Sequence, residues 1–268
     1  MRSTIRLLGL IVCFLWLSPV EAATCRDPAG FDAWLSGFKR EAAASGISPS
    51  AISALDGVAY DAGIVAKDHG QRVFRQSFEQ FSGRMVNANR LRRGASLMKQ
   101  YAATFARIEQ AYGVPAPVIV AIWGLETDFG AVSGNTPTLR ALATLAYDCR
   151  RSDMFQTELM DALRLVQRGD LSPSARGAWA GEVGQTQFMP SSYLKFAVDF
   201  DGNGRRDLVH SVPDVLASTA NFLQSYGWQR GGAWAPGSAN FAVIKEWNKA
   251  DVYARTIAYF ATRLAGNE

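Results

Sequence analysis

Glu126 follows an unusually apolar stretch of the chain, a setting that changes how a carboxyl group holds its proton. The stretch Val118–Leu125 contains only apolar residues and one glycine. A carboxylate deprived of water by such neighbours has a raised pKa, because its charged form is poorly solvated. A carboxylic acid that stays protonated near neutral pH can protonate a glycosidic oxygen. The spacing makes Glu126 a candidate general acid; the alternative is a structural ion pair with an arginine.

A glycine-rich loop, Trp179–Tyr193, places neutral polar groups among aromatic side chains. Glycines let the backbone approach a ligand closely, and Gln187, Ser191 and Tyr193 offer uncharged hydrogen-bonding groups. Flat rings combined with such groups suit a sugar, which has apolar faces and a rim of hydroxyls. We therefore predict that these three residues bind substrate. An ordinary loop leading into a helix opened by Pro190 would show the same pattern.

A third motif has the spacing of a calcium-binding loop. Asp199, Asp201 and Asn203 alternate, and the glycine that follows stands where such a loop turns sharply. Arg205 can supply a backbone carbonyl, but His210 occupies the place of the bidentate glutamate and is a poor ligand for a hard cation. Two interpretations remain, a structural calcium site and a metal-free turn. No cofactor is expected for the chemistry itself.

The elements that must position these residues are mainly helices. Apolar residues at helical spacing predict the following helices: Phe31–Ala44, a short one from Pro49, Asn89–Tyr112, Val118–Leu125, Leu139–Cys149, Met154–Gln167, Val212–Tyr226 and Asp251–Leu264. One short strand is predicted over Phe241–Ile244, and glycine-rich loops over Trp179–Pro190 and Asp199–Arg206. No linker rich in proline, glycine or serine divides the chain. We expect a mainly α fold with a small irregular or β element, forming one catalytic unit over residues 24–268.

Composition and charge exclude several classes of protein. With 48% hydrophobic and 19% charged residues among 268, the chain has a folding composition rather than a disordered one. The net charge of +4 is spread along the sequence. This mild excess suits an acidic polymer, but it falls short of a nucleic-acid-binding footprint.

Residues 1–23 have the form of a secretory signal peptide. Arg2 and Arg6 precede an apolar run, Leu7–Leu17, and small residues at Ala22 and Ala23 offer a cleavage site. The run is too short to span a bilayer comfortably, and no later stretch approaches that length. The mature chain is therefore expected to be exported, without a transmembrane segment.

Removal of the signal peptide leaves two cysteines, Cys25 and Cys149. In an oxidising compartment this parity predicts one disulfide between them, and the alternative is two unpaired thiols. Lipid attachment at Cys25 is not expected, because the preceding Ala22–Thr24 lacks the usual leucine and ends in threonine where glycine or alanine is typical.

Taken together, the motifs resemble the lytic murein transglycosylase B family. The resemblance rests on IWGLET at 122–127, GxxQFMPSSY at 184–193 and VDFDGNG at 198–204, with Gly227-Trp228 and the segment Trp247–Tyr253 following in order. It covers nearly the whole mature chain. It implies a lysozyme-like α-rich fold, a periplasmic location and peptidoglycan glycan strands as the partner. No nucleic acid is expected as a partner, and the sequence leaves possible protein partners in cell-wall synthesis undetermined.

The resemblance also implies an activity and site roles. The activity is non-hydrolytic cleavage of the β-1,4 bond between MurNAc and GlcNAc, which leaves 1,6-anhydro-MurNAc ends. Glu126 matches the family's single acid/base, Gln187 the glutamine that lines the sugar site, and Asn248 an asparagine near the sugar. The family's calcium loop is closed by an aspartate slightly further on, which here is Asp214.

Two further carboxylates keep other functions open. Glu182 stands where a small residue is common, and we expect a surface charge because a loop gives no reason for desolvation. Asp128 is expected to cap the helix that ends after Glu126. A muramidase would need a second carboxylate to activate water, and these two residues are its candidates. A non-catalytic peptidoglycan-binding scaffold is the other alternative, against which the intact Glu126 motif argues.

Overall fold

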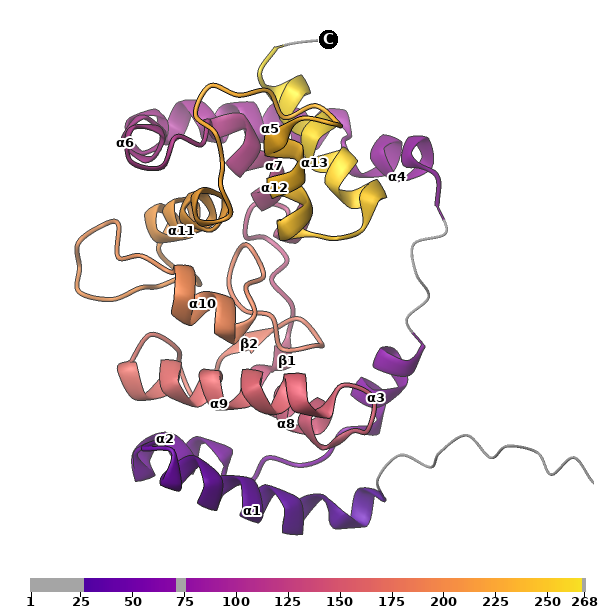
Figure 1. Cartoon of the computed structure of the whole chain (residues 1–268), viewed down its shortest axis with the longest axis vertical. Helices are drawn as coiled ribbons and strands as arrows, with labels where there is room; N and C mark the ends of the chain where they lie inside the picture. The colour runs from indigo at the N-terminus through magenta and orange to yellow at the C-terminus, as the bar shows by residue number, and fades with distance from the viewer. Residues whose placement is uncertain (1–26, 71–75, 267–268) are drawn as a thin grey trace, which may run out of the picture.

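The mainly helical class predicted from the sequence is confirmed. The computed structural model describes residues 27–70 and 76–266, and within them every regular element is a helix apart from one pair of two-residue strands. Figure 1 shows a lower group of helices, an upper group, and loops with the short strands between the two groups.

The lower group joins the N-terminal helices to a central pair. It contains η1 (Pro28–Gly30), α1 (Phe31–Ala44), α2 (Pro49–Ile52), η2 (Ser53–Leu55), α3 (Ala62–His69), α8 (Thr138–Tyr147) and α9 (Ser152–Arg168). Helices α8 and α9 pack against each other, α2 packs on α9, and α1 and α3 pack on α8. The rings of Phe31 and Tyr147 meet edge to face at 5.5 Å between centroids, which holds α1 against α8.

The upper group packs around one helix that is apolar up to its last two residues. It contains α4 (Phe78–Met85), α5 (Ala88–Gln100), α6 (Ala102–Tyr112), α7 (Ala116–Thr127), α11 (Val212–Ser225), α12 (Ala239–Trp247) and α13 (Asp251–Leu264). Helices α5, α6, α11 and α13 all pack on α7. Nine of the twelve residues of α7 are buried, which explains why its sequence is apolar on every side.

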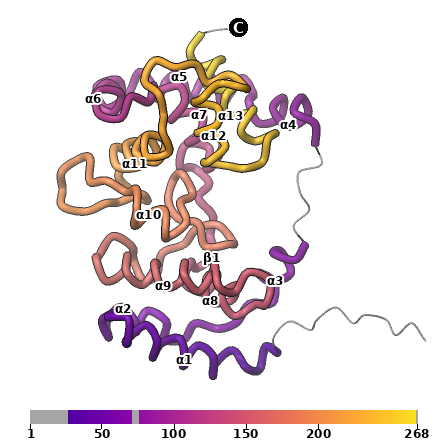
Figure 2. Tube along the Cα trace, viewed as in Figure 1, coloured from indigo at the N-terminus to yellow at the C-terminus, as the bar shows by residue number. Residues whose placement is uncertain are grey.

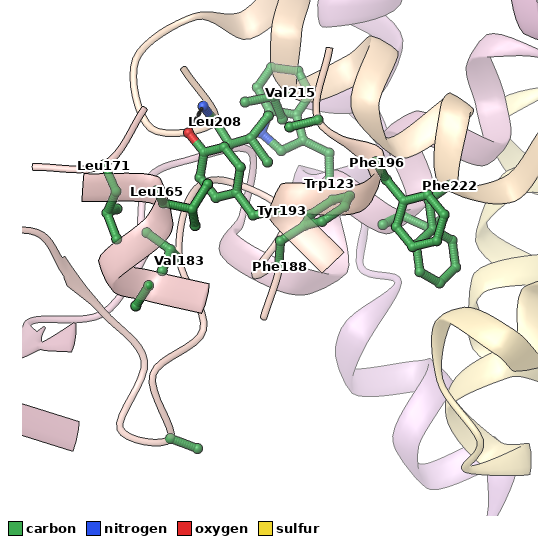
Figure 3. Packing of buried hydrophobic residues seen from close by; sticks show 14 of the residues in the cluster. Trp123, Leu165, Leu171, Val183, Phe188, Tyr193, Phe196, Leu208, Val215 and Phe222 are labelled. Carbon is green, nitrogen blue, oxygen red and sulfur yellow. Dashed lines mark hydrogen bonds between the residues drawn. The ribbon is translucent and has the colours of Figure 1, made fainter. Parts of the chain in front are cut away.

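Loops and short elements connect the two groups. Strand β1 (Thr136–Pro137) pairs antiparallel with β2 (Arg176–Gly177), and α10 (Pro190–Phe196) packs on both α9 and α11. The trace in Figure 2 shows the segment from β2 to α10 running between the groups. Buried side chains continue through this region: Trp123, Phe188 and Tyr193, labelled in Figure 3, belong to one buried cluster, so the core extends from α7 into the loop.

Two predicted elements differ from those observed. Phe241–Ile244 is not a strand but the middle of α12, where the Ser238 side chain caps the helix and Phe241 and Ile244 share its buried face. A short apolar run fits a strand or a buried helix equally well, so the sequence alone could not decide. The predicted helix Asn89–Tyr112 is two helices that break at Tyr101, because α5 packs mainly on α7 and α6 mainly on α11.

The predicted signal peptide (residues 1–23) and Cys25 lie outside the described residues. Cys149 is disulfide-bonded, and its pairing with Cys25 stays a prediction. Among residues 27–70 and 76–266 no single helix is long and apolar enough to cross a membrane; α6 and α7 reach that length only together, and they are bent by 110°.

Close packing at Gly124 generates a stability prediction. A Cβ atom placed there would lie 2.8 Å from the Phe129 ring and 2.9 Å from the Phe260 ring. We expect Gly124→Ala to lower the free energy of unfolding by about 1–3 kcal/mol, because both rings must shift. Gly83→Ala, in α4 with open space around its Cβ position, should instead raise it by about 0.5–1 kcal/mol. Urea unfolding measures both, and equal stabilities for the two variants would contradict the packing argument.

Candidate active site

A cavity of about 400 Å³ lies where the end of α7, the loop after β2, α11 and α12 come together. Its lining combines carboxylates, amides and aromatic rings. The lining residues are Glu126, Ala178, Glu182, Gln187, Phe188, Met189, Ser192, Phe222, Tyr226, Glu246, Trp247 and Asn248. The predicted acid, Glu126, and two of the predicted sugar-binding residues, Gln187 and Asn248, are therefore brought together.

Two hydrogen bonds hold one oxygen of the Glu126 carboxyl group. The indole Nε1 of Trp247 donates to Oε1 at 2.9 Å, and the hydroxyl of Tyr253 donates to the same atom at 2.8 Å. These donors come from α12 and α13, far along the chain from α7. Because Oε1 already accepts two hydrogen bonds, a proton on this group belongs on Oε2. The site thus fixes both the orientation of the acid and the atom that carries its proton.

Burial raises the pKa of Glu126 to about 7. The hydrogen bonds from Trp247 and Tyr253 act in the opposite direction, since they favour the carboxylate, and the negative charge of Glu182 adds to the rise. Desolvation therefore outweighs the two donors. A carboxyl group with a pKa near 7 is present as both acid and base at neutral pH, which suits proton donation followed by proton removal.

Gln185 fastens the cavity loop to α7, although sequence reasoning assigned it no role. The Trp123 Nε1 donates to the Gln185 side-chain oxygen at 3.0 Å, and the Thr127 hydroxyl donates to the Gln185 carbonyl at 2.5 Å. The Gln185 amide nitrogen donates in turn to the Val209 carbonyl at 3.0 Å. One side chain thus sets the distance between the helix that carries Glu126 and the loop opposite.

Gln187 lines the cavity in a strained backbone conformation. Its φ of 55° lies in the left-handed region, which costs a residue with a side chain free energy and is typical of functional loops. Its amide nitrogen donates to the carbonyls of Gly184 at 2.8 Å and Ser133 at 3.3 Å. Both amide hydrogens are used in this way, so the side-chain oxygen remains to bind a ligand.

Asn248 lies at the C-terminal end of α12 and, unlike Gln187, keeps a side-chain hydrogen-bond donor available. Its side-chain oxygen accepts the Ala250 N–H at 3.0 Å, which orients the amide and leaves its NH₂ group as donor. Gln187 and Asn248 therefore offer one acceptor and one donor to whatever enters the cavity.

Ser191 and Tyr193, predicted to bind substrate, do not line this cavity. The N–H and hydroxyl of Ser191 both donate to the buried Glu158 carboxylate, at 2.8 and 2.6 Å, which ties α10 to α9. Tyr193 is fully buried; its hydroxyl donates to the Arg206 carbonyl at 2.6 Å and accepts the Leu208 N–H at 3.0 Å. Their hydrogen-bonding groups are consumed by the fold. The neighbouring Ser192 lines the cavity instead.

The two extra carboxylates are placed very differently. Asp128 caps α7 and forms ion pairs with Arg90 at 3.1 Å and Arg93 at 3.5 Å, away from the cavity, as expected. Glu182 is not the surface charge predicted from its loop position. It lines the cavity, burial raises its pKa, and its Oε2 is buried without a hydrogen-bond partner among the described residues. A folded loop can desolvate a side chain as effectively as a helix does.

Aromatic rings form one wall of the cavity, and they include Phe188 from the loop whose aromatic side chains suggested sugar binding. Trp247 meets Phe188 edge to face at 5.3 Å and Phe222 at 4.9 Å between ring centroids. The indole N–H of Trp247 donates to Glu126, so the same side chain forms part of the cavity wall and orients the acid. The segment Trp247–Tyr253 contains both donors, but only the folded structure shows that they form hydrogen bonds to the Glu126 carboxyl group.

Comparison with known families decides where the chain belongs. The family model described as the transglycosylase SLT domain matches residues 30–238, which is more than half of the chain. The chain belongs to the transglycosylase SLT domain family.

Among relatives of this SLT-domain chain is the membrane-bound lytic murein transglycosylase B of Escherichia coli K12. The two are 38% identical over 154 residues, which cover 57% of this chain and 42% of the relative, so the match spans less than half of that protein.

Solved structures show the same fold over most of the chain. SltB3 from Pseudomonas aeruginosa, in complex with NAG-anhNAM-pentapeptide, has a TM-score of 0.84 and 30% identity, covering 88% of this chain and 80% of that one. SltB1 from the same organism, described as a soluble lytic transglycosylase, has a TM-score of 0.81 and 25% identity, covering 87% and 98%. These likenesses confirm the lysozyme-like α-rich class expected for the family.

The predicted metal loop of this SLT-domain chain brings three carboxylates close together. Carboxylate oxygens of Asp199, Asp201 and Asp214 lie within 4.8 Å of one another, with Asp214 supplied by the first turn of α11. The loop is held open by backbone N–H groups: Asp199 accepts those of Gly202 and Asn203, at 2.8 and 3.0 Å. Three converging carboxylates repel one another, and a cation between them would offset that repulsion.

We propose that these residues hold a structural calcium ion, with Asn203 and the Arg205 carbonyl completing the set. Hard cations prefer oxygen ligands, and every ligand here is an oxygen. The loop lies outside the Glu126 cavity, so the ion would support the fold and take no part in bond cleavage.

Calcium should therefore stabilise the protein. At calcium concentrations about 100-fold above Kd, linkage gives about 2.7 kcal/mol, or roughly 5–10 °C in Tm. Asp201→Asn should abolish most of this shift, whereas Asp56→Asn, which removes an exposed surface carboxylate, should retain it. Differential scanning calorimetry with and without chelator checks both. An unchanged Tm for the wild type at millimolar calcium would leave the loop a metal-free turn.

Proposed function

We propose that this protein is a periplasmic lytic transglycosylase. Its reaction is cleavage of the β-1,4 bond between MurNAc and GlcNAc in peptidoglycan glycan strands, leaving 1,6-anhydro-MurNAc ends. The observation that carries the proposal is Glu126, a carboxyl group whose pKa burial raises to about 7, on the wall of a cavity with aromatic rings and neutral amides. Family membership and the murein-cleaving relatives support it.

Bond cleavage begins with proton donation from Glu126. The proton on Oε2 is transferred to the glycosidic oxygen, and the C1–O bond breaks with an oxocarbenium-like charge on the MurNAc ring. The donors from Trp247 and Tyr253 on Oε1 hold the carboxyl group in one orientation during this step. They also stabilise the carboxylate that remains, which lowers the barrier to giving up the proton.

Closure of the anhydro ring uses the same carboxylate as a base. Glu126 accepts the proton of the MurNAc C6 hydroxyl, whose oxygen forms a bond to C1. The hydroxyl belongs to the same sugar, so its effective concentration far exceeds that of a diffusing nucleophile. Gln187 and Asn248, with one acceptor and one donor, hold the sugar beside the aromatic wall.

Replacement of the acid tests the mechanism. Glu126→Gln retains the shape of the side chain but cannot donate the proton, so release of anhydro-muropeptides from purified sacculi should fall by about 10²-fold or more, with glycan binding retained. Asp128→Asn, which changes a carboxylate two residues away outside the cavity, should keep activity. Near-wild-type turnover by Glu126→Gln would refute the assignment.

Loss of one hydrogen bond to Glu126 should move the pH profile in a known direction. The Tyr253 hydroxyl lowers the Glu126 pKa, so Tyr253→Phe should raise it above its value of about 7. The acid form then persists to higher pH, and the alkaline fall in kcat/KM should shift upward by about 0.5–1 pH unit. Turnover of sacculi measured from pH 5 to 9 gives the shift. Movement toward lower pH would show that the hydroxyl does not act on this carboxyl group as described.

A muramidase on the same bond is the second candidate, favoured by Glu182 as a further carboxylate in the cavity. Hydrolysis adds water to the product and transglycosylation does not. Mass spectrometry of the released muropeptides separates the two activities: reducing MurNAc ends identify the muramidase, and anhydro ends the transglycosylase.

A further inference from the structure

The loop that carries Glu182 is built so tightly that its backbone has little freedom. Gly181 and Gly184 flank the residue with φ values of 94° and 80°, and a Cβ at Gly181 would lie 2.4 Å from Leu142. A Cβ at Gly177 would lie 1.9 Å from the Glu182 carbonyl, which accepts the Ala178 N–H at 3.0 Å. Tertiary packing therefore holds Glu182 in place at the cavity wall, a placement that a mobile surface charge would not have.

The surroundings of Glu182 compensate its charge only in part, through backbone amides at Glu182 and Ala180 and one arginine. Its Oε2 is buried and receives no hydrogen bond from any described residue. Arg151, at the start of α9, is the cation that acts on it, but this guanidinium is engaged in an ion pair with Asp68 and lies over the Phe155 ring at 4.8 Å. Burying a charge without a full partner costs stability, so a purely structural role does not explain the residue.

The other charged groups around this carboxylate are mostly acidic. Glu126 faces the same cavity from α7, and Glu246 faces it from α12 beside Lys249, with which it forms an ion pair. Glu158 on α9 also acts on Glu182, although its own carboxylate is bound to Ser191. The residues that line the cavity therefore include three carboxyl groups and no lysine or arginine.

We propose that Glu182 is a second functional carboxylate of the active site, whose negative charge stabilises the cationic sugar ring as the glycosidic bond breaks. The proposal rests on the proposed function. Positive charge develops on the ring in the transition state only, and a fixed charge in a dry site acts on it more strongly than in water. One protonated and one ionised carboxyl group in a single cavity is a division of roles set by environment.

The division is physically consistent. Burial is the largest influence on both groups and raises the pKa of each, but at Glu182 it is opposed by backbone amides at Glu182 and Ala180 and by the Arg151 guanidinium, which favour the charged form. The ionised Glu182 then favours the protonated form of Glu126. The same negative charge thus acts twice, once by keeping the proton on the acid and once by stabilising the cation that forms when the proton has left.

Charge removal without loss of shape tests this role. For Glu182→Gln we expect kcat on sacculi to fall about 10- to 100-fold, with little change in binding of non-reacting glycan. The alkaline limb of the pH profile should also move to lower pH, since a nearby negative charge no longer raises the Glu126 pKa. Glu182→Asp, which keeps the charge, should restore that limb. Glu41→Gln removes an exposed charge outside the cavity and serves as the matched control.

Each result decides between roles. Wild-type kcat and an unshifted pH limb for a folded Glu182→Gln would overturn the proposal while leaving the transglycosylase intact. So would a fall in Tm that lowers activity equally at every pH, which is the mark of a structural residue. If the wild type released reducing ends and Glu182→Gln released anhydro ends at the same rate, Glu182 would instead activate water, and the proposed role would be wrong. Absence of any wild-type muropeptide release would instead refute the proposed function, and this role with it.

Discussion

The structure depends on keeping one carboxyl group out of water while leaving it able to give up its proton. Glu126 meets this requirement at the end of a helix that is buried on almost every side, so its pKa rises to about 7. Burial alone would produce a very weak acid. The donors on Oε1 limit the rise and keep the carboxylate stable after the proton has left. The balance between desolvation and two hydrogen bonds sets the chemistry of the site.

That balance requires three separate parts of the chain to meet. Helix α7 carries the acid, helices α12 and α13 carry its two donors, and the loop after β2 carries the opposite wall. Gln185 joins the loop to α7 through the side chains of Trp123 and Thr127. Within this loop, Gln187 keeps its left-handed conformation while its side-chain amide donates to the Gly184 and Ser133 carbonyls. The loop lies between the two groups of helices in Figure 1, and contacts with both groups fix its position.

Polar residues next to the site divide into those that the fold consumes and those that it leaves available. Ser191 donates to Glu158, and the Tyr193 hydroxyl is bonded to the Arg206 and Asp170 carbonyls and accepts the Leu208 N–H, so the two residues fasten α10 and the metal loop. Glu182 is desolvated, yet its Oε2 receives no hydrogen bond within the part of the chain that the structure describes. Residue type alone does not separate the polar side chains that are bound within the fold from those that stay available. Their orientation separates them, and it depends on contacts with residues distant in sequence.

The local sequence pattern was sufficient to predict most of the helices and to single out Glu126 as the candidate acid. Apolar periodicity predicts α1, α8, α9, α11 and α13 because each buries one face on the core, and the uniformly apolar α7 makes Glu126 a desolvated carboxyl group. Three decisions were left to tertiary structure. The run Phe241–Ile244 became a helix because packing selected one of two compatible periods, and Tyr101 broke a helix because its two halves pack on different partners. The third is that Trp247, Tyr253 and Glu182 surround Glu126: hydrogen bonds and burial depend on distances in space, which spacing along the chain does not determine.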